Sequence, residues 1–238
     1  MKNILILGGS SDIAFELIPK LLSRGCKVTA HYSKNSKRLN SLMKKNKNLK
    51  IFKKDFSNLS NSNLNRFLKI KEVSNNDTII NLIGFMDNKT FNNTSMDQTI
   101  NSLKINMLIP IFIIRKNLGY MTKINYGRIL NCTSIGIKFG GGDFSYNYNL
   151  SKHSLEFVPK YLKILSKKNI LVNNLRIGYT NTKIHKRMKK NLKGKNRINL
   201  IPMKRAANPL EIVEYILNLI SKRNSYMTGE TITVAGGE

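Results

Sequence analysis

The chain has 238 residues, of which 41% are hydrophobic, and it carries a formal net charge of +28. This length is ordinary for one α/β domain, here expected over residues 1–238, and allows a substantial core. The longest apolar run, Met107–Ile114, is too short to span a membrane, and the apolar start is too short for a signal peptide. Cys26 and Cys132 provide no disulfide framework. These features predict a cytoplasmic protein.

The excess of basic residues has two interpretations. A charge of +28 is compatible with nucleic-acid binding. However, basic residues are scattered through most of the chain, and their densest segment, 183–197, lacks the interleaved aromatic residues of a single-strand stacking surface. We therefore favour solvated basic surfaces, and we expect neither a nucleic-acid partner nor a membrane partner.

Short β-rich runs alternate with amphipathic stretches along the chain. Strands that alternate with helices of ten or more residues favour βαβ units and a parallel sheet. Right-handed crossovers then give a doubly wound α/β fold of the Rossmann type, with about seven strands and helices on both faces. The expected strands are Asn3–Leu7, Lys27–His31, Lys50–Lys53, Thr78–Leu82, Gly127–Cys132, Leu171–Ile177 and Thr231–Val234. The expected helices are Asp12–Arg24, Lys37–Asn46, Ser60–Lys71, Met96–Met121, Tyr146–Lys167 and Pro209–Ser221.

Three prolines and one apolar stripe bear on these helices. Pro19, Pro110 and Pro159 fall inside predicted helices, where each removes a backbone hydrogen bond and should kink the helix. The fourth predicted helix carries an apolar stripe, which we expect to face the sheet, although part of it could serve a subunit contact. The stripe consists of Ile100, Leu103, Met107, Ile111 and Ile114.

The segment Leu5–Ala14 is typical of a strand, a turn of small residues and the start of a helix. Such a turn brings N–H groups against a pyrophosphate, with the positive end of the helix dipole behind them. Gly8 and Gly9 allow positive φ angles and close approach, and Ser11 or Asp12 can cap the helix. A simple β–α turn has the same pattern, so this segment alone leaves a purely structural role open.

A second candidate site consists of Tyr148 and Lys152, with Ser134 upstream. Positions i and i+4 share one face of a helix. An ammonium group there favours the phenolate, so we expect it to lower the pKa of Tyr148 from the ordinary value of about 10. A serine hydroxyl nearby can hold a substrate oxygen while the tyrosine transfers its proton. Tyr146 has no lysine four residues later, and we expect it to be dispensable.

Other residues have plainer interpretations. We expect Cys132 to be a core residue rather than a nucleophile, and we interpret His31 and His185 as isolated. No group of histidine, cysteine and acidic residues has metal-ligand spacing, so no metal site is expected.

Taken together, the motifs resemble the short-chain dehydrogenase/reductase family over essentially the whole length. The family opens with Thr-Gly-x-x-x-Gly-Ile-Gly, which aligns with Leu7–Ala14. Gly8 and Ile13 match, whereas Asp12 replaces the second glycine and must point its carboxylate away from the pyrophosphate, into a cap. Ala14 replaces the third glycine, a mild change because that position needs a small side chain.

Further family motifs follow in the expected order. Asn81–Gly84 resembles Asn-Asn-Ala-Gly, and Gly127–Ser134 resembles Gly-Arg-Ile-Val-Asn-x-Ser-Ser. Ile177–Thr182 resembles Pro-Gly-x-x-x-Thr, and Thr228–Gly237 resembles Thr-Gly-x-x-Ile-x-Val-Asp-Gly-Gly. The pair Asp55-Phe56 resembles the pair that borders the adenine.

The resemblance implies the roles of individual residues. Tyr148 is the implied acid and base, Lys152 supports it and holds the nicotinamide ribose, Ser134 binds the substrate oxygen, and Asn106 anchors a proton-relaying water. The implied cofactor-binding residues are Gly8, Ser10, Ser11, Asp12, Ile13, Ser33, Lys34, Asp55, Phe56, Asn81, Gly84, Tyr148, Lys152, Gly178, Thr180 and Thr182.

Dinucleotide preference is read at the end of the second strand, where an acid binds the 2′-hydroxyl of NAD and basic or small polar residues accept the 2′-phosphate of NADP. The segment 31–38 has no acid and several donors. We therefore expect NADP(H), contacted by Ser33 and Lys34, with NAD(H) possible. The alternative is that these lysines are ordinary solvated charges.

The expected reaction is hydride transfer between the nicotinamide and a small-molecule ketone or secondary alcohol. A basic substrate flap at 181–200 suggests an anionic substrate, such as a nucleotide sugar, an acidic sugar or an acyl group on an acidic carrier. The alternatives are a 3-oxoacyl-[acyl-carrier-protein] reductase and, from another class, a non-catalytic dinucleotide-sensing protein. The resemblance also implies a homotetramer or homodimer formed through the fourth and fifth helices.

Overall fold

The computed structural model describes residues 2–183 and 194–238, and within these residues seven strands form one parallel sheet. The strand order is β3-β2-β1-β4-β5-β6-β7, which confirms the predicted doubly wound α/β fold. The strands are β1 Asn3–Leu7, β2 Lys27–Tyr32, β3 Leu49–Lys53, β4 Thr78–Asn81, β5 Gly127–Ser134, β6 Ile170–Ile177 and β7 Thr231–Val234.

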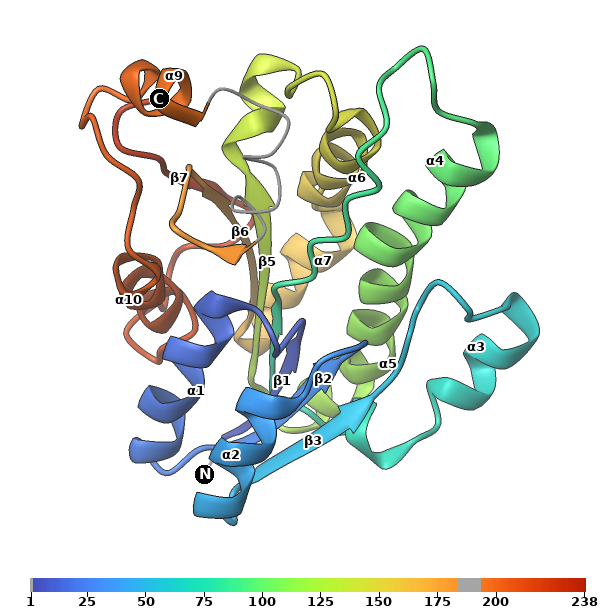
Figure 1. Cartoon of the computed structure of the whole chain (residues 1–238). Helices are drawn as coiled ribbons and strands as arrows, with labels where there is room; N and C mark the ends of the chain where they lie inside the picture. Colours follow the sequence, from blue (N-terminus) through green and yellow to red (C-terminus); the bar gives the residue numbers. More distant parts are fainter. Residues whose placement is uncertain (1, 184–193) are drawn as a thin grey trace.

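Helices connect these strands and cover both faces of the sheet (Figure 1). The α-helices are α1 Asp12–Ser23, α2 Lys37–Lys45, α3 Asn61–Phe67, α4 Met96–Leu103, α5 Ile109–Lys123, α6 Tyr146–Glu156, α7 Lys160–Ile164, α9 Gly194–Leu200 and α10 Pro209–Leu219. The 3₁₀ segments are Lys71–Val73, Ile135–Phe139 and Leu165–Lys168, and Lys104–Leu108 forms a π-turn.

Alternating side chains of the strands divide the core in two. Ile4 and Ile6 of β1 pack with α1, α2 and α10 on one face, whereas Leu5 and Leu7 pack with α3 and α5 on the other. Successive side chains of a strand point to opposite faces, so an unbroken apolar run is what a strand buried on both faces requires. No helix within the described residues is long and apolar enough to cross a membrane.

The fourth predicted helix differs from the expectation in two respects. It runs as α4, the π-turn and α5, and Pro110 lies in the first turn of α5, where it has no N–H to donate to the carbonyl of Asn106. The expectation that its apolar stripe faces the sheet is wrong for Ile100 and Ile111, which are 51% and 39% exposed. Ile114 of the stripe does face the core, together with Ile105, Ile109 and Ile113, which the stripe did not include.

The fifth predicted helix is broken rather than kinked. Helix α6 ends at Glu156, Phe157 is extended, and Pro159 is the N-cap residue of α7. A residue before proline avoids the helical region, so the chain leaves the helix two residues before Pro159. As expected, the turn from Tyr148 to Lys152 stays regular within α6.

Candidate functional site

The candidate site lies at the carboxyl ends of the parallel strands, where β1, β4 and β5 deliver the loops that follow them (Figure 1). The strand order reverses between β1 and β4, since β2 lies on the far side of β1. A crevice outside the carboxyl ends at such a switch point is the usual ligand site of an open α/β sheet.

The loop after β1 is shaped for close approach. Gly8 has a φ of +82°, and a Cβ atom there would lie 2.7 Å from the carbonyl oxygen of Leu82. A Cβ on Gly9 would lie 2.8 Å from that of Ala30. Ser11 caps α1 by accepting a hydrogen bond from the N–H of Ala14 at 3.1 Å. The other N–H groups of the first turn have no partner within the helix.

Asp12 does not cap α1, so that expectation is wrong. Its Oδ1 accepts a hydrogen bond from Nη1 of Arg38 at 2.6 Å, and its Oδ2 accepts one from the backbone N–H of Lys183 at 2.7 Å. Burial alone would raise the pKa of Asp12, but the bonds from Lys183 and Arg38 outweigh it and lower the pKa. The carboxylate is therefore ionised, and both of its oxygens accept hydrogen bonds from cationic residues.

His31, interpreted from the sequence as isolated, proves to be a central support of this loop. Its Nδ1 accepts a hydrogen bond from the N–H of Gly8 at 3.4 Å, and Nε2 lies 2.7 Å from the carbonyl oxygen of Lys54. Its ring stacks on Phe56 with 4.3 Å between centroids. Burial lowers the pKa of His31 to about 4, so the ring is neutral and its Nε2–H donates. Its place at the end of β2 was the signal that sequence reasoning missed.

The other residues predicted around the adenosine differ in exposure. Ser33 is half-buried and Lys34 is exposed, so both are accessible. Asp55 accepts hydrogen bonds from the N–H and hydroxyl of Ser57, and the side-chain bond is the main reason that its pKa is lowered. Phe56 is only 2% exposed, so its ring supports His31 from the core rather than facing outward.

Two buried asparagines organise the loop after β4. Asn81 is fully buried and its Oδ1 accepts a hydrogen bond from the N–H of Ile83. Asn106 lies in the π-turn. Its Oδ1 accepts a hydrogen bond from the N–H of Phe85 at 2.9 Å, and its Nδ2 donates to the carbonyl oxygen of Phe85 and to Ser151 Oγ, each at 2.9 Å. Its side chain therefore joins the segment beginning at Gly84 to the helix that carries Lys152, and the water-anchoring role stays a prediction.

Ser134 and Tyr148 meet at the end of β5. The Ser134 hydroxyl accepts a hydrogen bond from the N–H of Gly136 at 3.2 Å and bonds the phenol of Tyr148. Burial raises the pKa of Tyr148 to about 12, and the bond from Ser134 offsets only part of that rise. The sequence-based expectation of a lowered pKa is therefore wrong for this structure, in which the phenol is protonated at neutral pH.

Lys152 is 2% exposed, and its Nζ lies over the ring of Tyr148. Its Nζ donates to the carbonyl oxygens of Ile83 at 2.6 Å and Cys132 at 2.7 Å, and lies 5.8 Å from the Tyr148 ring centroid. Burial lowers the pKa of Lys152 to about 8. An ammonium has three donors and the neutral amine has two, so deprotonation would sacrifice neither carbonyl bond.

The residues with plainer interpretations behave as expected in part. Cys132 is buried, and burial raises its pKa to about 12, which confirms a core residue rather than a nucleophile. Tyr146 packs edge-on against Phe91, away from the pair at 148 and 152. Within the described residues no cluster of three potential metal ligands occurs.

The third loop of the site follows β6. A Cβ on Gly178 would lie 2.5 Å from Cα of Ala235, so this position needs glycine. Thr180 and Thr182 are buried, with hydroxyls donating to the carbonyls of Gly178 and Thr180. Of the predicted flap at 181–200, residues 184–193 lie outside the described part of the chain, and α9 forms its end.

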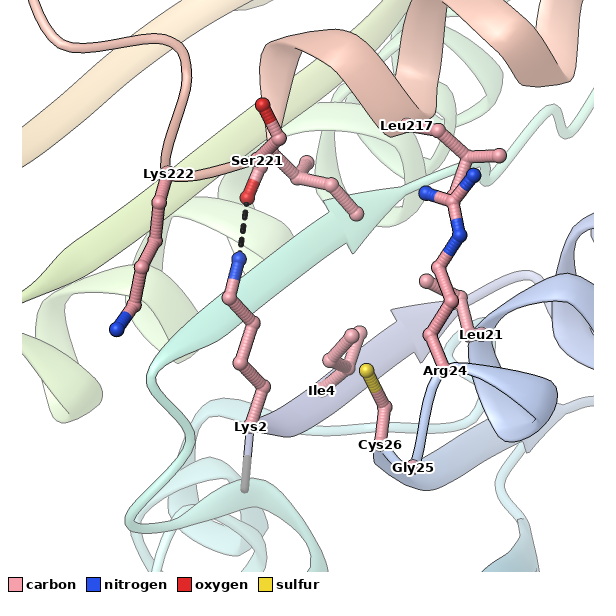
Figure 2. Close-up of a pocket in the computed structure, with 10 residues that line it drawn as sticks. Lys2, Ile4, Leu21, Arg24, Gly25, Cys26, Leu217, Ser221 and Lys222 are labelled. Atoms are coloured by element: carbon pink, nitrogen blue, oxygen red, sulfur yellow. Dashed lines mark hydrogen bonds between the residues drawn. The ribbon is translucent and has the colours of Figure 1, made fainter.

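A cavity of about 310 Å³ lies at the opposite edge of the sheet, where the strands begin (Figure 2). It lies between the ends of α1 and α10, with Ile4, Leu21 and Leu217 as apolar walls and the basic residues Lys2, Arg24 and Lys222 around it. None of the predicted site residues lines it. It is therefore separate from the candidate active site.

Comparison with known proteins agrees with the geometry. Residues 8–238 match the family model described as enoyl-(acyl carrier protein) reductase. A 3-oxoacyl-[acyl-carrier-protein] reductase of Aquifex aeolicus (strain VF5) is 29% identical over 241 residues, which cover 99% of this chain and 96% of the relative.

Solved structures show the same fold. A 4-hydroxyisoleucine dehydrogenase complexed with NADH has a TM-score of 0.86 at 26% identity, covering 100% of this chain and 98% of that chain. A 3-oxoacyl (acyl-carrier-protein) reductase from Agrobacterium tumefaciens C58 with NADP bound has a TM-score of 0.85 at 20% identity, covering 100% of this chain and 94% of that chain.

The chain belongs to the short-chain dehydrogenase/reductase family of oxidoreductases, which act on carbonyl and alcohol groups with a nicotinamide dinucleotide. The residues present fit that cofactor. Gly8 and Gly178 bring the loops after β1 and β6 into close contact with Leu82 and Ala235, which a larger side chain would prevent, and the start of α1 follows the first of these loops as a pyrophosphate site requires.

Proposed function

We propose that this protein reduces the ketone of a 3-oxoacyl thioester, with NADPH as the preferred hydride donor. The meeting of Ser134, Tyr148 and Lys152 at the carboxyl edge, beside the loop at Gly8, carries this proposal. The acyl-carrier relatives support the substrate class, and the charge of +28 suits an acidic carrier. Fold alone does not define a substrate, so the substrate needs its own test.

The protonation states favour reduction. A bound nicotinamide would supply a hydride to the carbonyl carbon. The oxygen then needs a proton, and the phenol of Tyr148, with a pKa raised to about 12, holds one at neutral pH. The Ser134 hydroxyl bonds the phenol oxygen and is placed to bond the carbonyl oxygen as well.

Lys152 completes the proton path in this proposal. With a pKa of about 8 it is mostly protonated at neutral pH, and its two carbonyl bonds leave one donor for the cofactor ribose or for the relay. The buried link from Asn106 through Ser151 fixes the helix that carries it.

NADPH is preferred in this proposal because no acid follows β2, while Ser33 and Lys34 are accessible there. Among structural neighbours, one holds NADP and another holds NADH, so titration with both cofactors is required. Tighter binding of NADH than of NADPH would contradict this part of the proposal.

We also propose a homodimer or homotetramer formed through the fourth and fifth predicted helices, which are α4 with α5 and α6 with α7 in the structure. Helices α4 and α5 and the π-turn between them expose Ile100, Leu108, Ile111 and Phe112, each at least 36% accessible, and Ile100 and Ile111 are the outward-facing part of the apolar stripe. Contiguous exposed apolar residues mark interaction surfaces. Light scattering of the purified protein and of Ile111→Lys tests this, and an unchanged monomer in both would contradict it.

The experiment for the activity follows NADPH absorbance with an acetoacetyl thioester. We expect Tyr148→Phe to lose at least about 100-fold in turnover, the typical contribution of a general acid, while NADPH binding is retained. Tyr146→Phe is the matched control and should keep its activity. Activity retained in Tyr148→Phe would refute the assignment, and dinucleotide binding without turnover on any carbonyl would favour the sensing alternative.

A further inference from the structure

Three consecutive residues at the end of β5 are each bonded to a different turn of α6. The carbonyl oxygen of the first, Cys132, accepts a hydrogen bond from Lys152 Nζ at 2.7 Å. The hydroxyl of the third, Ser134, bonds the phenol of Tyr148. The middle residue is bonded to the side chain at position 156. Positions 148, 152 and 156 are four residues apart, so all three contacts come from one face of the helix.

A carboxylate holds the middle residue, Thr133. Its buried hydroxyl donates to Oε1 of Glu156 at 2.6 Å. Cys132 belongs to the core shared with α1 and α10, so its neighbour Thr133 points to the opposite face, where α6 lies. Arg176 of β6 lies opposite Thr133 in the strand register, and it donates to Oε1 at 3.0 Å and to Oε2 at 2.5 Å. One carboxylate therefore joins β5, β6 and α6.

Glu156 occupies a position that does not favour a carboxylate. It is the last residue of α6, where the helix dipole is negative, and its side chain is only 10% exposed. A buried ion pair is often no more stabilising than apolar side chains of the same volume. Stability alone therefore does not account for the pair of Glu156 and Arg176, whereas a fixed carboxylate between two strands and a helix accounts for how Thr133 is held.

The position of Thr133 sets that of Ser134. Ser134 is the last residue of β5, and its hydroxyl already accepts a hydrogen bond from the N–H of Gly136 in the turn that follows. The bond between Thr133 and Glu156 fixes the strand end on the other side of Ser134. A misplacement of about 1 Å at reacting groups can cost about 100-fold in rate, so such support has a kinetic consequence.

We propose that Glu156 is a positioning residue for carbonyl reduction, which acts through Thr133 to hold Ser134 in line with Tyr148 and the substrate oxygen. This inference rests on the proposed function of Ser134 and Tyr148 and adds what aligns them. The carboxylate of Glu156 is bonded to Thr133 and Arg176, so it supports the strand end and carries no proton in the reaction.

The first test is Thr133→Val, which removes the hydroxyl but keeps the shape of the side chain and the ion pair. With NADPH and an acetoacetyl thioester, kcat should fall at least about 10-fold while the KM for NADPH stays within about 2-fold, because only the alignment at Ser134 is disturbed. Thr133→Ser restores a hydroxyl and should recover kcat to within about 3-fold of the wild type. A wild-type kcat in Thr133→Val would overturn the inference.

The ion pair is tested by replacing both partners. The double variant Glu156→Met with Arg176→Met should unfold at the same denaturant concentration as the wild type or a higher one. Its kcat should nevertheless fall as far as in Thr133→Val, and adding Thr133→Val to it should change kcat by less than about 2-fold. A double variant that keeps the kcat of the wild type would contradict a role for Glu156 in the reaction.

Thr78→Val is the matched control for a buried hydroxyl. Thr78 is fully buried in β4, and its hydroxyl donates to Oδ1 of Asp77 at 2.8 Å, at the amino edge of the sheet. It should lose as much stability as Thr133→Val but keep the kcat of the wild type. Equal losses of kcat in the two variants would show that looser packing alone slows the reaction, and the positioning role would then be rejected.

Two further measurements locate the effect at Ser134. In a Ser134→Ala background, Thr133→Val should lower kcat by less than about 2-fold, and a full additional loss would mean that Glu156 does not act through Ser134. The ¹³C NMR signal of Tyr148 Cζ, identified by its absence in Tyr148→Phe, should shift in Thr133→Val but not in Thr78→Val. This signal needs no substrate, so an unshifted signal overturns the positioning role. A wild type that reduces no carbonyl would instead overturn the proposed function.

Discussion

Two buried cations at opposite ends of β5 show how similar burial can serve different ends. Arg128 near the start of β5 and Lys152 beside its end are each 2% exposed, and neither makes an ion pair within the described residues. All five N–H donors of Arg128 are used, on Gly127, Asn169 (twice), Ser221 and Asn224. Lys152 uses two donors, on Ile83 and Cys132.

The difference separates a structural charge from a chemical one. Arg128 ties β5 to the end of α10 and to the turn before β6, and no donor remains for a ligand. Lys152 keeps one position that is a donor when protonated and an acceptor when neutral, at the edge where the cofactor loop lies. A buried charge with an incomplete set of partners is therefore the stronger indication of function.

Replacement of Lys152 by Met is expected to have the largest effect. It removes the proposed proton path and the ribose donor, so turnover should fall about 10²- to 10⁴-fold. Stability should fall less than in Arg128→Met, because the carbonyls of Ile83 and Cys132 lose a donor but a buried charge without a carboxylate is replaced by an apolar chain of similar length. Steady-state kinetics and denaturant unfolding measure the two. A loss of stability comparable with that of Arg128→Met would end the contrast.

The reverse outcome is expected for Arg128→Met. The carbonyl groups of Gly127, Asn169, Ser221 and Asn224 lose a donor, and each buried group left unsatisfied costs about 1–3 kcal/mol, so we expect a loss of at least about 3 kcal/mol in unfolding free energy. The folded fraction should keep the kcat/KM of the wild type. A kcat/KM reduced more than about 10-fold at a temperature where the variant is folded would contradict the structural role.

The pH dependence of stability distinguishes the two cations next. Burial lowers the pKa of Lys152 from 10.5 to about 8, so folding favours its neutral form. Below pH 8 both folded and unfolded states are protonated and the burial penalty is fully present. Between pH 8 and 10.5 only the unfolded state retains the proton, so the penalty is relieved as pH rises.

The wild type should therefore gain about 2 kcal/mol relative to Lys152→Met between pH 8 and pH 10. Below pH 10, ionisation of Tyr148 does not interfere, because its raised pKa of about 12 affects stability only above the pKa of an exposed tyrosine. Denaturant unfolding of both proteins at several pH values measures the difference. Parallel curves would show that Lys152 is not perturbed by burial.

The sequence predicts the strands well, because unbroken apolar runs such as Leu5–Leu7 tolerate only a strand buried on both faces. It also predicts that Ser134 and Tyr148 meet, through motifs that are widely separated in the chain. It fails where the outcome depends on surroundings that no local pattern encodes. The pKa of Tyr148 depends on burial by its surroundings, and the hydrogen-bond partners of His31 come from the loop at Gly8 and from Lys54, just after β3.

Helix boundaries and faces show the same limit. Pro159 predicts a disturbance, but whether the chain kinks or breaks depends on how β6 and α7 pack. Ile100 and Ile111 of the apolar stripe face outward, whereas Ile114 faces the core, because α4 and α5 are joined by a π-turn, which shifts the register between them. A π-turn adds one residue to a turn of the helix, and a hydrophobic pattern with a period of 3.6 residues does not reveal such an insertion.

The smallest effect is expected at the cavity of Figure 2, from Lys2→Met. Lys2 donates to the carbonyl of Ile220 at 2.8 Å, and burial, followed by the nearby charge of Arg128, lowers its pKa. The substitution loses one hydrogen bond, but it also removes a positive charge that repels Arg128. We therefore expect the unfolding free energy to change by less than about 1 kcal/mol. Reductase activity should be unchanged, because this edge lies at the far end of the strands from Tyr148. A fall in kcat/KM at unchanged stability would mean that the amino edge takes part in the reaction, and the separation of the two ends of the sheet would then fail.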